Sequence, residues 1–234
     1  MCPSPASQPR GGDWAGLFRQ VGAVWEASQP GAPHVQTSLG GSHVDKYFNS
    51  DVVVASPGLT TQVVESVLVP GLSRVIEAPD WVLSYAPFGL FLAHAVAQAL
   101  DARCAYSDPR SEYAIHFDIR ASDSVLVIAD DLHSGSSILK TIEQVERRGA
   151  QAAPAIFCLA NLSGKSALGE REIISAATLE PHRYPAEACP LCAEGSSALA
   201  PRPNWPTLLA STRPRGRLQG LEDPTATPGA RRQP

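Results

Sequence analysis

The stretch VLVIADDLHSGSSILKTIEQVERRGA, residues Val125–Ala150, decides the fold. Its apolar, β-branched start, Val125–Ala129, predicts a strand that is buried on both faces. Polar and small residues follow and suit a loop. Apolar side chains then recur at helical spacing from Ile138 to Val145, and Gly149 is well placed to end that helix. The stretch therefore predicts a strand, a loop and a helix in succession.

The same alternation extends through most of the chain. Ala153–Asn161 predicts a further buried strand, Trp81–Tyr85 a strand, and Leu90–Leu100 a helix with one apolar face. Residues 57–71 begin with proline and end with glycine, which favours another helix. His43–Ala55 is polar, then aromatic, then β-branched, and predicts two strands or a strand and a turn. Alternating strands and helices indicate an α/β fold with a mainly parallel sheet flanked by helices.

Length and composition indicate one folded domain with loose ends. The chain has 234 residues, 44% of them apolar, which is enough for a buried core. We assign the domain to residues 14–210. Residues 1–13 look loose, and residues 211–234 carry five arginines against two acids with no apolar periodicity. Both terminal segments are therefore predicted to be disordered.

Charge, cysteine and hydropathy patterns exclude several classes of protein. The net charge of −4 argues against a general nucleic-acid binder. No apolar run is long enough to span a bilayer, and the first residues lack the apolar core of a secretory signal. Five cysteines, three of them isolated, make a disulfide framework improbable. We expect a cytoplasmic protein without nucleic-acid or membrane partners.

Asp130–Ser137 lies where an α/β sheet binds its ligands, at the carboxyl end of a strand. Backbone amides at the start of a helix favour an anion, and small residues let a phosphate approach closely. The hydroxyl groups of Ser134, Ser136 and Ser137 add donors. Asp130 and its neighbour can accept hydrogen bonds from sugar hydroxyls or hold Mg²⁺ through water. The alternative is purely structural: the acids end the strand and Ser134 caps the helix.

These residues resemble a known signature. The segment Val125–Ala150 is similar to the phosphoribosyl-diphosphate signature of type I phosphoribosyltransferases. Ser38–Asp51 resembles the amino-terminal segment of orotate phosphoribosyltransferases, and His182–Pro201 the carboxyl end of their short bacterial and archaeal branch. The ordered resemblance covers about residues 37–205. It implies the α/β fold of that family with small amino- and carboxyl-terminal hood elements, and a homodimer.

The resemblance also implies roles for individual residues. Asp130 and Asp131 would be the catalytic pair and face the ribose 2′- and 3′-hydroxyls. The 5′-phosphate would bind Ser134, Gly135, Ser136 and Ser137. The pyrophosphate loop would be Ala86, Pro87, Phe88 and Gly89. Candidates for the base side are Lys46, Tyr47 and Ser50. Mg²⁺ would arrive with the substrate, and no direct protein ligands are assigned to it.

This sequence departs from the family pattern where positive charge is expected. Ser50 stands in place of a lysine, Ala114 and Ile115 in place of two arginines, and Ser136 in place of a glycine. The basic residues available to compensate are Lys46, Arg103, Arg110, His116 and Arg120. We therefore expect an orotate phosphoribosyltransferase-like enzyme whose acceptor base is open. The alternative is a non-catalytic protein on the same fold that binds a ribose phosphate or a nucleotide.

Cys189 and Cys192 form a single CxxC, with His182 seven residues before it. One such pair with one distant histidine is a weak signal for zinc, which needs four ligands in a closed site. A redox pair is a further alternative, although no thioredoxin-like context surrounds it. A structural turn is the default interpretation.

Overall fold

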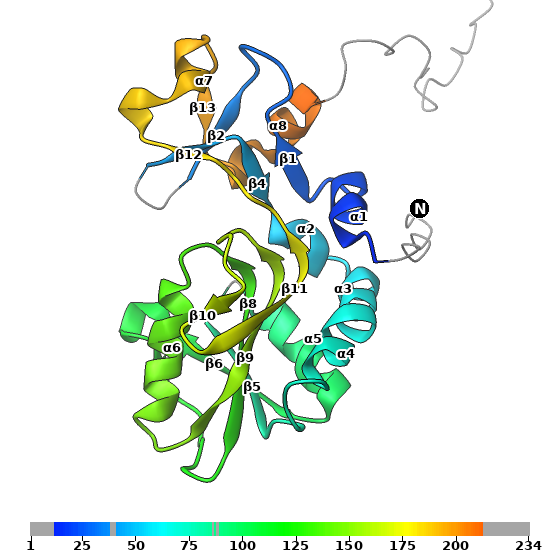
Figure 1. Cartoon of the computed structure of the whole chain (residues 1–234), viewed down its shortest axis with the longest axis vertical. Coiled ribbons are helices and arrows are strands. Elements are labelled where there is room, and N and C mark those ends of the chain that lie inside the picture. Colours follow the sequence, from blue (N-terminus) through cyan, green and yellow to red (C-terminus); the bar gives the residue numbers. More distant parts are fainter. Residues whose placement is uncertain (1–11, 38–40, 86, 88, 213–234) are drawn as a thin grey trace, which may run out of the picture.

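A computed structural model describes residues 12–37, 41–85, 87 and 89–212. Within these residues a seven-stranded sheet carries helices on both faces, and a smaller body sits at one end of it (Figure 1). We call this smaller body the hood. It combines residues 24–37 and 41–48 from the amino-terminal part of the chain with residues 183–212 from the carboxyl-terminal part.

The order of the main sheet is β10-β11-β9-β8-β5-β6-β7. The strands β11, β9, β8, β5 and β6 run parallel to their neighbours, while β10 and β7 add antiparallel edges. The predicted, mainly parallel sheet is confirmed. Its strands are β5 (Trp81–Tyr85), β6 (Arg103–Asp108), β7 (Ala114–Ile115), β8 (Ser124–Leu132), β9 (Gln151–Asn161), β10 (Ala167–Leu168) and β11 (Arg171–Thr178).

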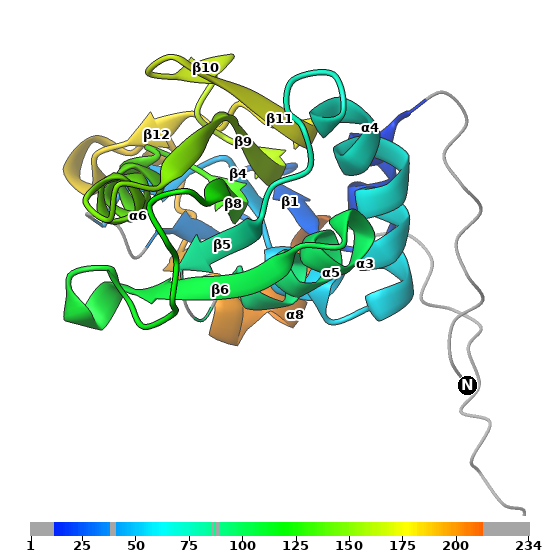
Figure 2. The same ribbon diagram turned by 90° about the horizontal axis from the view of Figure 1, so that it is seen from below.

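Helices cover the two faces of the sheet unequally. Figure 2 shows α6 on one side and the group α3, α4 and α5 on the other. The flanking helices are α1 (Trp14–Gln20), α2 (Ser50–Val54), α3 (Pro57–Val63), α4 (Val69–Leu72), α5 (Leu90–Leu100) and α6 (Ser136–Glu146), with the π-helical segment η1 (Val64–Leu68) between α3 and α4 and the 3₁₀ turn η2 (Pro109–Ser111) after β6.

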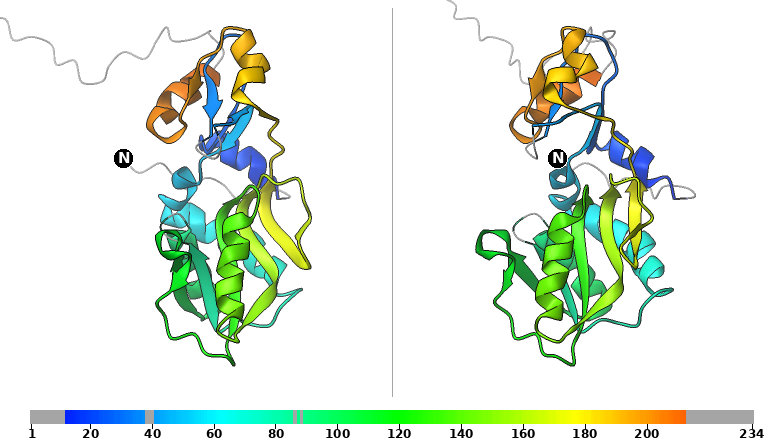
Figure 3. Two further views of the ribbon diagram at one scale, coloured as in Figure 1. Left: turned by 90° about the vertical axis from the view of Figure 1, so that its left-hand side faces the viewer. Right: turned by 60° about the vertical axis from the view of Figure 1, so that its left-hand side comes forward.

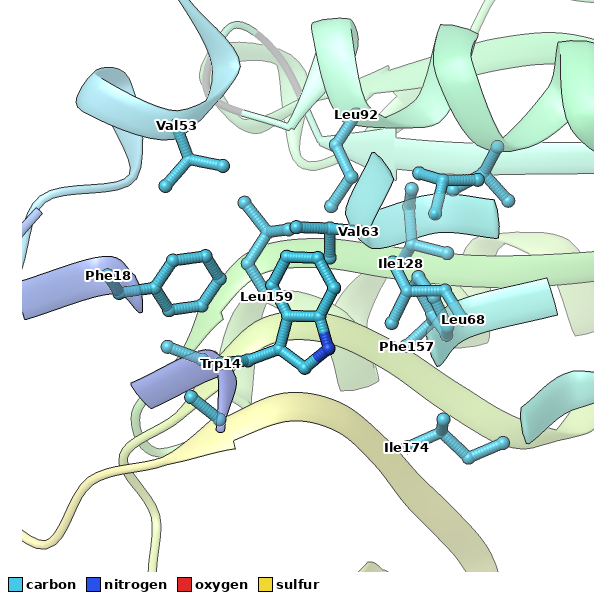
Figure 4. Packing of buried hydrophobic residues seen from close by; sticks show 14 of the residues in the cluster. Trp14, Phe18, Val53, Val63, Leu68, Leu92, Ile128, Phe157, Leu159 and Ile174 are labelled. Carbon is cyan, nitrogen blue, oxygen red and sulfur yellow. The ribbon is translucent and has the colours of Figure 1, made fainter. Parts of the chain in front are cut away.

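Strand β8 is buried on both faces because its side chains alternate between two apolar cores. Leu126 and Ile128 belong to the core beneath α3–α5, whereas Val125 and Val127 belong to the core beneath α6. Figure 4 shows the first core, where α1 adds Trp14 and other aromatic groups beside β9. This two-sided burial explains why the sequence of β8 is continuously apolar rather than alternating.

The hood is built from short strands and has its own small core. Its elements are β1 (Val24–Glu26), β2 (His34–Gln36), β3 (His43–Val44), β4 (Lys46–Phe48), β12 (Arg183–Tyr184), η3 (Ala186–Ala188), α7 (Pro190–Ala193), β13 (Ala198–Leu199), η4 (Arg202–Asn204) and α8 (Trp205–Thr212). One sheet has the order β12-β3-β2-β13, so both ends of the chain contribute to it. Trp25, Val35 and Trp205 pack together at its centre. Figure 3 shows the hood standing over one end of the main sheet.

One sequence prediction needs correction. For residues 43–55 we expected two strands or a strand and a turn; two strands, β3 and β4, are present, but Ser50–Val54 forms helix α2. Asn49 caps this helix, because its side chain accepts a hydrogen bond from the Asp51 amide at 3.2 Å. Val53 is fully buried in the main core. Tertiary packing thus overrides the strand preference of the valines.

Helices α1 and α8 lie near the two ends of the described range, while the predicted domain of residues 14–210 stays a prediction. Asp13 caps α1 by accepting a hydrogen bond from the Gly16 amide at 2.7 Å, and α8 continues to Thr212. The remainder of the two predicted disordered segments, residues 1–11 and 213–234, lies outside the described residues. Among the described helices, none has the length and hydropathy to cross a membrane.

Candidate active site

A cavity of about 400 Å³ opens at the carboxyl ends of β8 and β5, under the hood. It is lined by residues 130–138 from the main domain together with Tyr85, and by Tyr47 and residues 200–203 from the hood. The strand, acid pair and serine-rich loop singled out in the sequence therefore form most of its wall. This is the edge at which open parallel sheets bind ligands.

The two acids of the cavity have different surroundings. Asp130 is 2% exposed, and its Oδ2 accepts a hydrogen bond from the Ser50 hydroxyl at 2.5 Å. Burial, together with the neighbouring Asp131, raises the pKa of Asp130. Asp131 is partly exposed, and its Oδ2 lies 3.7 Å from Nε2 of His133. Asp131 is thus the more accessible carboxylate, whereas Asp130 is buried and is oriented by the hydrogen bond from Ser50.

Gly135 determines the shape of the loop of residues 134–137. We call this loop the phosphate loop. The φ of Gly135, +80°, lies in the left-handed region, and a Cβ there would come within 2.5 Å of the Leu168 side chain. A side chain is therefore excluded for both conformational and steric reasons. Ser136, which replaces a glycine of the resembling family, does not have a positive φ and begins α6. It therefore needs no unusual backbone angle.

The serines of the phosphate loop surround the start of α6. The Ser134 hydroxyl accepts from the Ser136 amide at 3.3 Å, and Ser137 Oγ lies 2.9 Å from the Tyr113 hydroxyl. Gly135, the N-cap residue of α6, has no side chain to accept hydrogen bonds from the first-turn amides. Amides at a helix start, with nearby hydroxyls, suit a phosphate group.

The end of β5 forms the second wall of the cavity. Burial, with the acid pair nearby, raises the pKa of Tyr85 and keeps its phenol protonated. In the expected pyrophosphate loop, Pro87 is exposed and Gly89 caps α5. A Cβ on Gly89 would lie 1.9 Å from Ser84 Oγ and 2.9 Å from Ser84 Cβ, so a side chain there would force Ser84 to move. Ala86 and Phe88 lie outside the described residues.

The three base-side candidates occupy different places. Tyr47 lines the cavity and packs on Trp205, with ring centroids 6.0 Å apart. Lys46 lies on β4 outside the cavity wall. Ser50 is 1% exposed and holds Asp130 rather than lining the cavity.

The hood contributes positive charge to the cavity. The sequence analysis did not identify the arginines that supply it. Arg202 lines the cavity, with its Nε 3.0 Å from Asp51. Arg183 on β12 donates a hydrogen bond to Nδ1 of His133, so hood and main domain meet across the site. The only sequence signal for Arg202 was its position just after His182–Pro201 and within the residues 37–205 that the resemblance covers.

The basic residues proposed from the sequence do not line this cavity. Arg103 pairs with Asp123 at 3.3 Å and lies over the Trp81 ring, at the opposite end of the strands. The cavity lining also does not include Lys46, Arg110, His116 or Arg120. Ala114 and Ile115, which replace two arginines, form the edge strand β7. The described part of the cavity wall thus has fewer cations than the family pattern implies.

The CxxC also acquires partners that the sequence did not indicate. His182, the candidate named with it, instead pairs with Asp45, with 2.6 Å between Nδ1 and Oδ2. Cys189 and Cys192 lie beside His34 and His43 from the other half of the hood. The CxxC therefore meets two distant histidines rather than the one that precedes it in sequence.

The acid pair fits a role with Mg²⁺. Carboxylate oxygens are hard ligands of the kind that Mg²⁺ prefers, directly or through water. Asp131 offers partly exposed oxygens to the cavity, whereas Asp130 has one oxygen committed to Ser50. Asp131 is therefore the better placed of the two to contact the hydration shell of an ion brought in by a substrate.

Comparisons with known proteins find orotate phosphoribosyltransferases that are similar to this chain. The chain is 30% identical over 183 residues to the orotate phosphoribosyltransferase of one strain of Thermus thermophilus, covering 76% of this chain and 94% of that protein. It is 26% identical over 164 residues to the orotate phosphoribosyltransferase of Heliobacterium modesticaldum, covering 69% and 85%. The crystal structure of orotate phosphoribosyltransferase from Aeropyrum pernix superposes with a TM-score of 0.56 at 20% identity, covering 70% and 93%. No family model matches the chain.

The parallel sheet, the acid pair and the phosphate loop define the class as a type I phosphoribosyltransferase. Within that class, the identity and coverage shared with the Thermus protein are decisive. This chain belongs to the orotate phosphoribosyltransferase family, as a divergent member.

Proposed function

We propose that this protein transfers the 5-phosphoribosyl group from phosphoribosyl diphosphate to a ring nitrogen of a base and releases pyrophosphate. The observation that carries the proposal is the joining of the acid pair and the phosphate loop in one cavity. A sugar phosphate needs both parts: acceptors for its hydroxyls and donors for its phosphate.

Each part of the cavity has a proposed task. The carboxylates of Asp130 and Asp131 accept hydrogen bonds from the ribose 2′- and 3′-hydroxyls, and the phosphate loop binds the 5′-phosphate. The hydroxyl of Ser50 holds Asp130 in one orientation. The reaction exchanges a carbon–oxygen bond at ribose C1 for a carbon–nitrogen bond, so positioning of the two partners is the main contribution of the protein.

The leaving pyrophosphate needs positive charge. Mg²⁺, when bound with the substrate, supplies charge neutralisation. On the protein side, Arg202 lines the cavity and Arg183 contacts His133 beside Asp131. Both arginines belong to the hood, so the hood would supply positive charge to the leaving group.

The acceptor is proposed to be neutral or differently charged from orotate. Ser50 stands in place of a lysine and is turned toward Asp130, so it offers no charge to a carboxylate. Tyr47 presents an aromatic ring to the cavity, which suits stacking with a planar base. A cytoplasmic location and a homodimer are part of the proposal and rest on the cysteine usage and on the family resemblance.

A pyrophosphate-release assay tests this function. The full chain is incubated with phosphoribosyl diphosphate, Mg²⁺ and a panel of bases that includes orotate and uracil. We expect release that depends on one class of base. Asp131→Asn should lower kcat/KM at least about tenfold, because a charged hydrogen bond contributes about 1.5–3 kcal/mol.

The matched control is Asp118→Asn, whose side chain is 86% exposed and lies outside the cavity wall. It should retain full activity. Tight binding of phosphoribosyl diphosphate without release for any base would instead favour the non-catalytic binding protein. Absence of both binding and release would refute both functions.

A further inference from the structure

Four potential metal ligands meet inside the hood, away from the cavity. His34 and His43 come from β2 and β3, and Cys189 and Cys192 flank the start of α7. Their ligand atoms all lie within 4.8 Å of one another. We call these four residues the cysteine–histidine cluster. They come from segments about 150 residues apart, so the sequence alone could not pair them.

The distances within this cluster fit a tetrahedral ion. Zinc binds sulfur at about 2.3 Å and nitrogen at about 2.0–2.1 Å, which places the corners of a tetrahedron about 3.3–3.8 Å apart. His34 Nε2 lies 3.7 Å from Cys189 Sγ and 3.6 Å from Cys192 Sγ. Cys192 Sγ lies 3.3 Å from His43 Nδ1, and the two histidine nitrogens are 3.0 Å apart. The last distance is slightly short, and a small ring rotation would adjust it.

A neighbouring serine orients one histidine for metal binding. The Ser196 hydroxyl donates its hydrogen to the carbonyl of Ala32, so toward Nδ1 of His34, 2.6 Å away, it acts as the acceptor. Nδ1 of His34 therefore carries a hydrogen, and Nε2 presents its lone pair to the cysteines. Metal-bound histidines characteristically have their second nitrogen fixed in this way.

The burial of the cysteine–histidine cluster also favours a bound metal ion over side chains solvated by water. His34 is 1% exposed, His43 5% and Cys189 4%, while Cys192 is partly exposed. Buried polar atoms need partners, and two sulfurs with two imidazoles form a closed set of four ligands. Mixed sulfur and nitrogen ligands in a tetrahedron suit zinc better than Mg²⁺ or Ca²⁺.

We propose that the cysteine–histidine cluster binds one structural zinc ion. The ion joins the amino-terminal and carboxyl-terminal parts of the hood. Strand β13 follows the cluster, pairs with β2, and leads directly into residues 200–203 of the cavity wall. Zinc thereby fixes the position of Arg202 over the proposed substrate site. A closed set of four protein ligands leaves no open position for catalysis at the metal itself.

Metal content is the first test. The full chain, purified without a histidine tag or added metal, should contain about one zinc per chain by mass spectrometry of the metals. After removal of zinc by a chelator, the melting temperature should fall, and zinc should restore it. Titration of this stripped chain with Co²⁺ should give the visible absorption of a tetrahedral ion with thiolate ligands. A native chain without zinc whose stripped form gives no such spectrum would overturn the proposal.

Matched variants test the assignment of ligands. Cys192→Ser and His43→Asn should each lose most of the zinc, and Cys192→Ser should also weaken the thiolate band of Co²⁺. The controls are Cys104→Ser and His182→Asn, because neither residue belongs to the cluster. Both controls should keep one zinc per chain. Full zinc content in Cys192→Ser, or loss of zinc only in His182→Asn, would refute the site.

Discussion

The carboxyl ends of β8 and β5 are neighbours in the same sheet, yet they supply different chemistry to the cavity. The end of β8 carries the acid pair and a glycine-shaped phosphate loop that match the family signature. The end of β5 contributes Tyr85 instead, and the expected lysine and arginines are replaced by Ser50 on α2 and by Ala114 and Ile115 on the edge strand β7. Among the described residues, Arg202 and Arg183 of the hood bring positive charge to this side, and they pair with Asp51 and His133.

This difference separates two parts of one reaction. The ribose-phosphate side needs a fixed geometry that a few backbone positions impose, so it is sensitive to any change. The base and pyrophosphate side depends on charge, which different side chains can provide from different elements. A divergent family member can therefore keep its donor substrate while changing its acceptor. Substitutions on either side should reveal this separation.

The largest effect is expected on the base side. Orotate carries a carboxylate that a buried site must pair, and Ser50 provides no charge for it. We predict a kcat/KM for orotate at least about a hundredfold below that of the Thermus relative, equivalent to about 2.7 kcal/mol. Steady-state kinetics on both proteins measure it. A value of about 10⁴ M⁻¹s⁻¹ or more would show that hood arginines replace the missing lysine.

On the ribose-phosphate side, Gly135→Val should weaken binding of phosphoribosyl diphosphate more than about tenfold. The new side chain would meet Leu168 and would have to adopt a positive φ. Calorimetry gives the dissociation constant, and thermal melting checks that the variant folds. Gly58→Val is the control, since a Cβ there meets nothing within 4 Å. An unchanged dissociation constant for Gly135→Val would reject the loop as the phosphate site.

Asp130→Asn should make the protein more stable while damaging its site. Burial raises the pKa of Asp130, so the ionised form destabilises the folded state. Stability therefore falls as pH rises from the unfolded pKa to the raised folded pKa, and the loss persists above it. The amide avoids this loss and its oxygen can still accept from Ser50. Each pKa unit of elevation corresponds to about 1.4 kcal/mol, and 1 kcal/mol to about 2–4 °C in melting temperature.

Thermal melting measured across a range of pH tests whether Asp130→Asn raises the stability of the protein. The variant should melt above the wild type near pH 8, and the difference should vanish near pH 4, where Asp130 is protonated in the folded chain. Asp118→Asn, an exposed substitution, should show no such pH-dependent gain. If Asp130→Asn were less stable than the wild type at pH 8, the folded state would stabilise the ionised form of Asp130, contrary to this prediction.

The smallest effect is expected from removal of the carboxyl-terminal tail, which is not part of this comparison. Removal of residues 213–234 should change the melting temperature by less than about 1 °C and leave substrate binding intact, because the segment has no apolar periodicity to bury. The cut must follow Thr212, since Leu208 of α8 belongs to the hood core. A drop of several degrees would show that the tail docks on the domain.

Local pattern was enough to predict the framework of this protein. Continuous apolar runs marked β8 and β9, and helical spacing marked α5 with the residue bounds that the structure has. The order of these elements requires a parallel sheet, and the carboxyl end of β8 then had to carry the acid pair and the phosphate loop. These positions depend on neighbours in sequence, so spacing was enough to place them, whereas the roles of the acids and the loop were implied by the family resemblance.

Tertiary structure alone decided everything that joins distant segments. Ser50 reaches Asp130 only because packing turns a valine-rich run into helix α2. Arg202 reaches the cavity because the two ends of the chain share one hood sheet. The same sheet gives Cys189 and Cys192 their histidine partners. Such contacts arise from burial of apolar surface between segments far apart in the chain, and no local periodicity records which segments will meet.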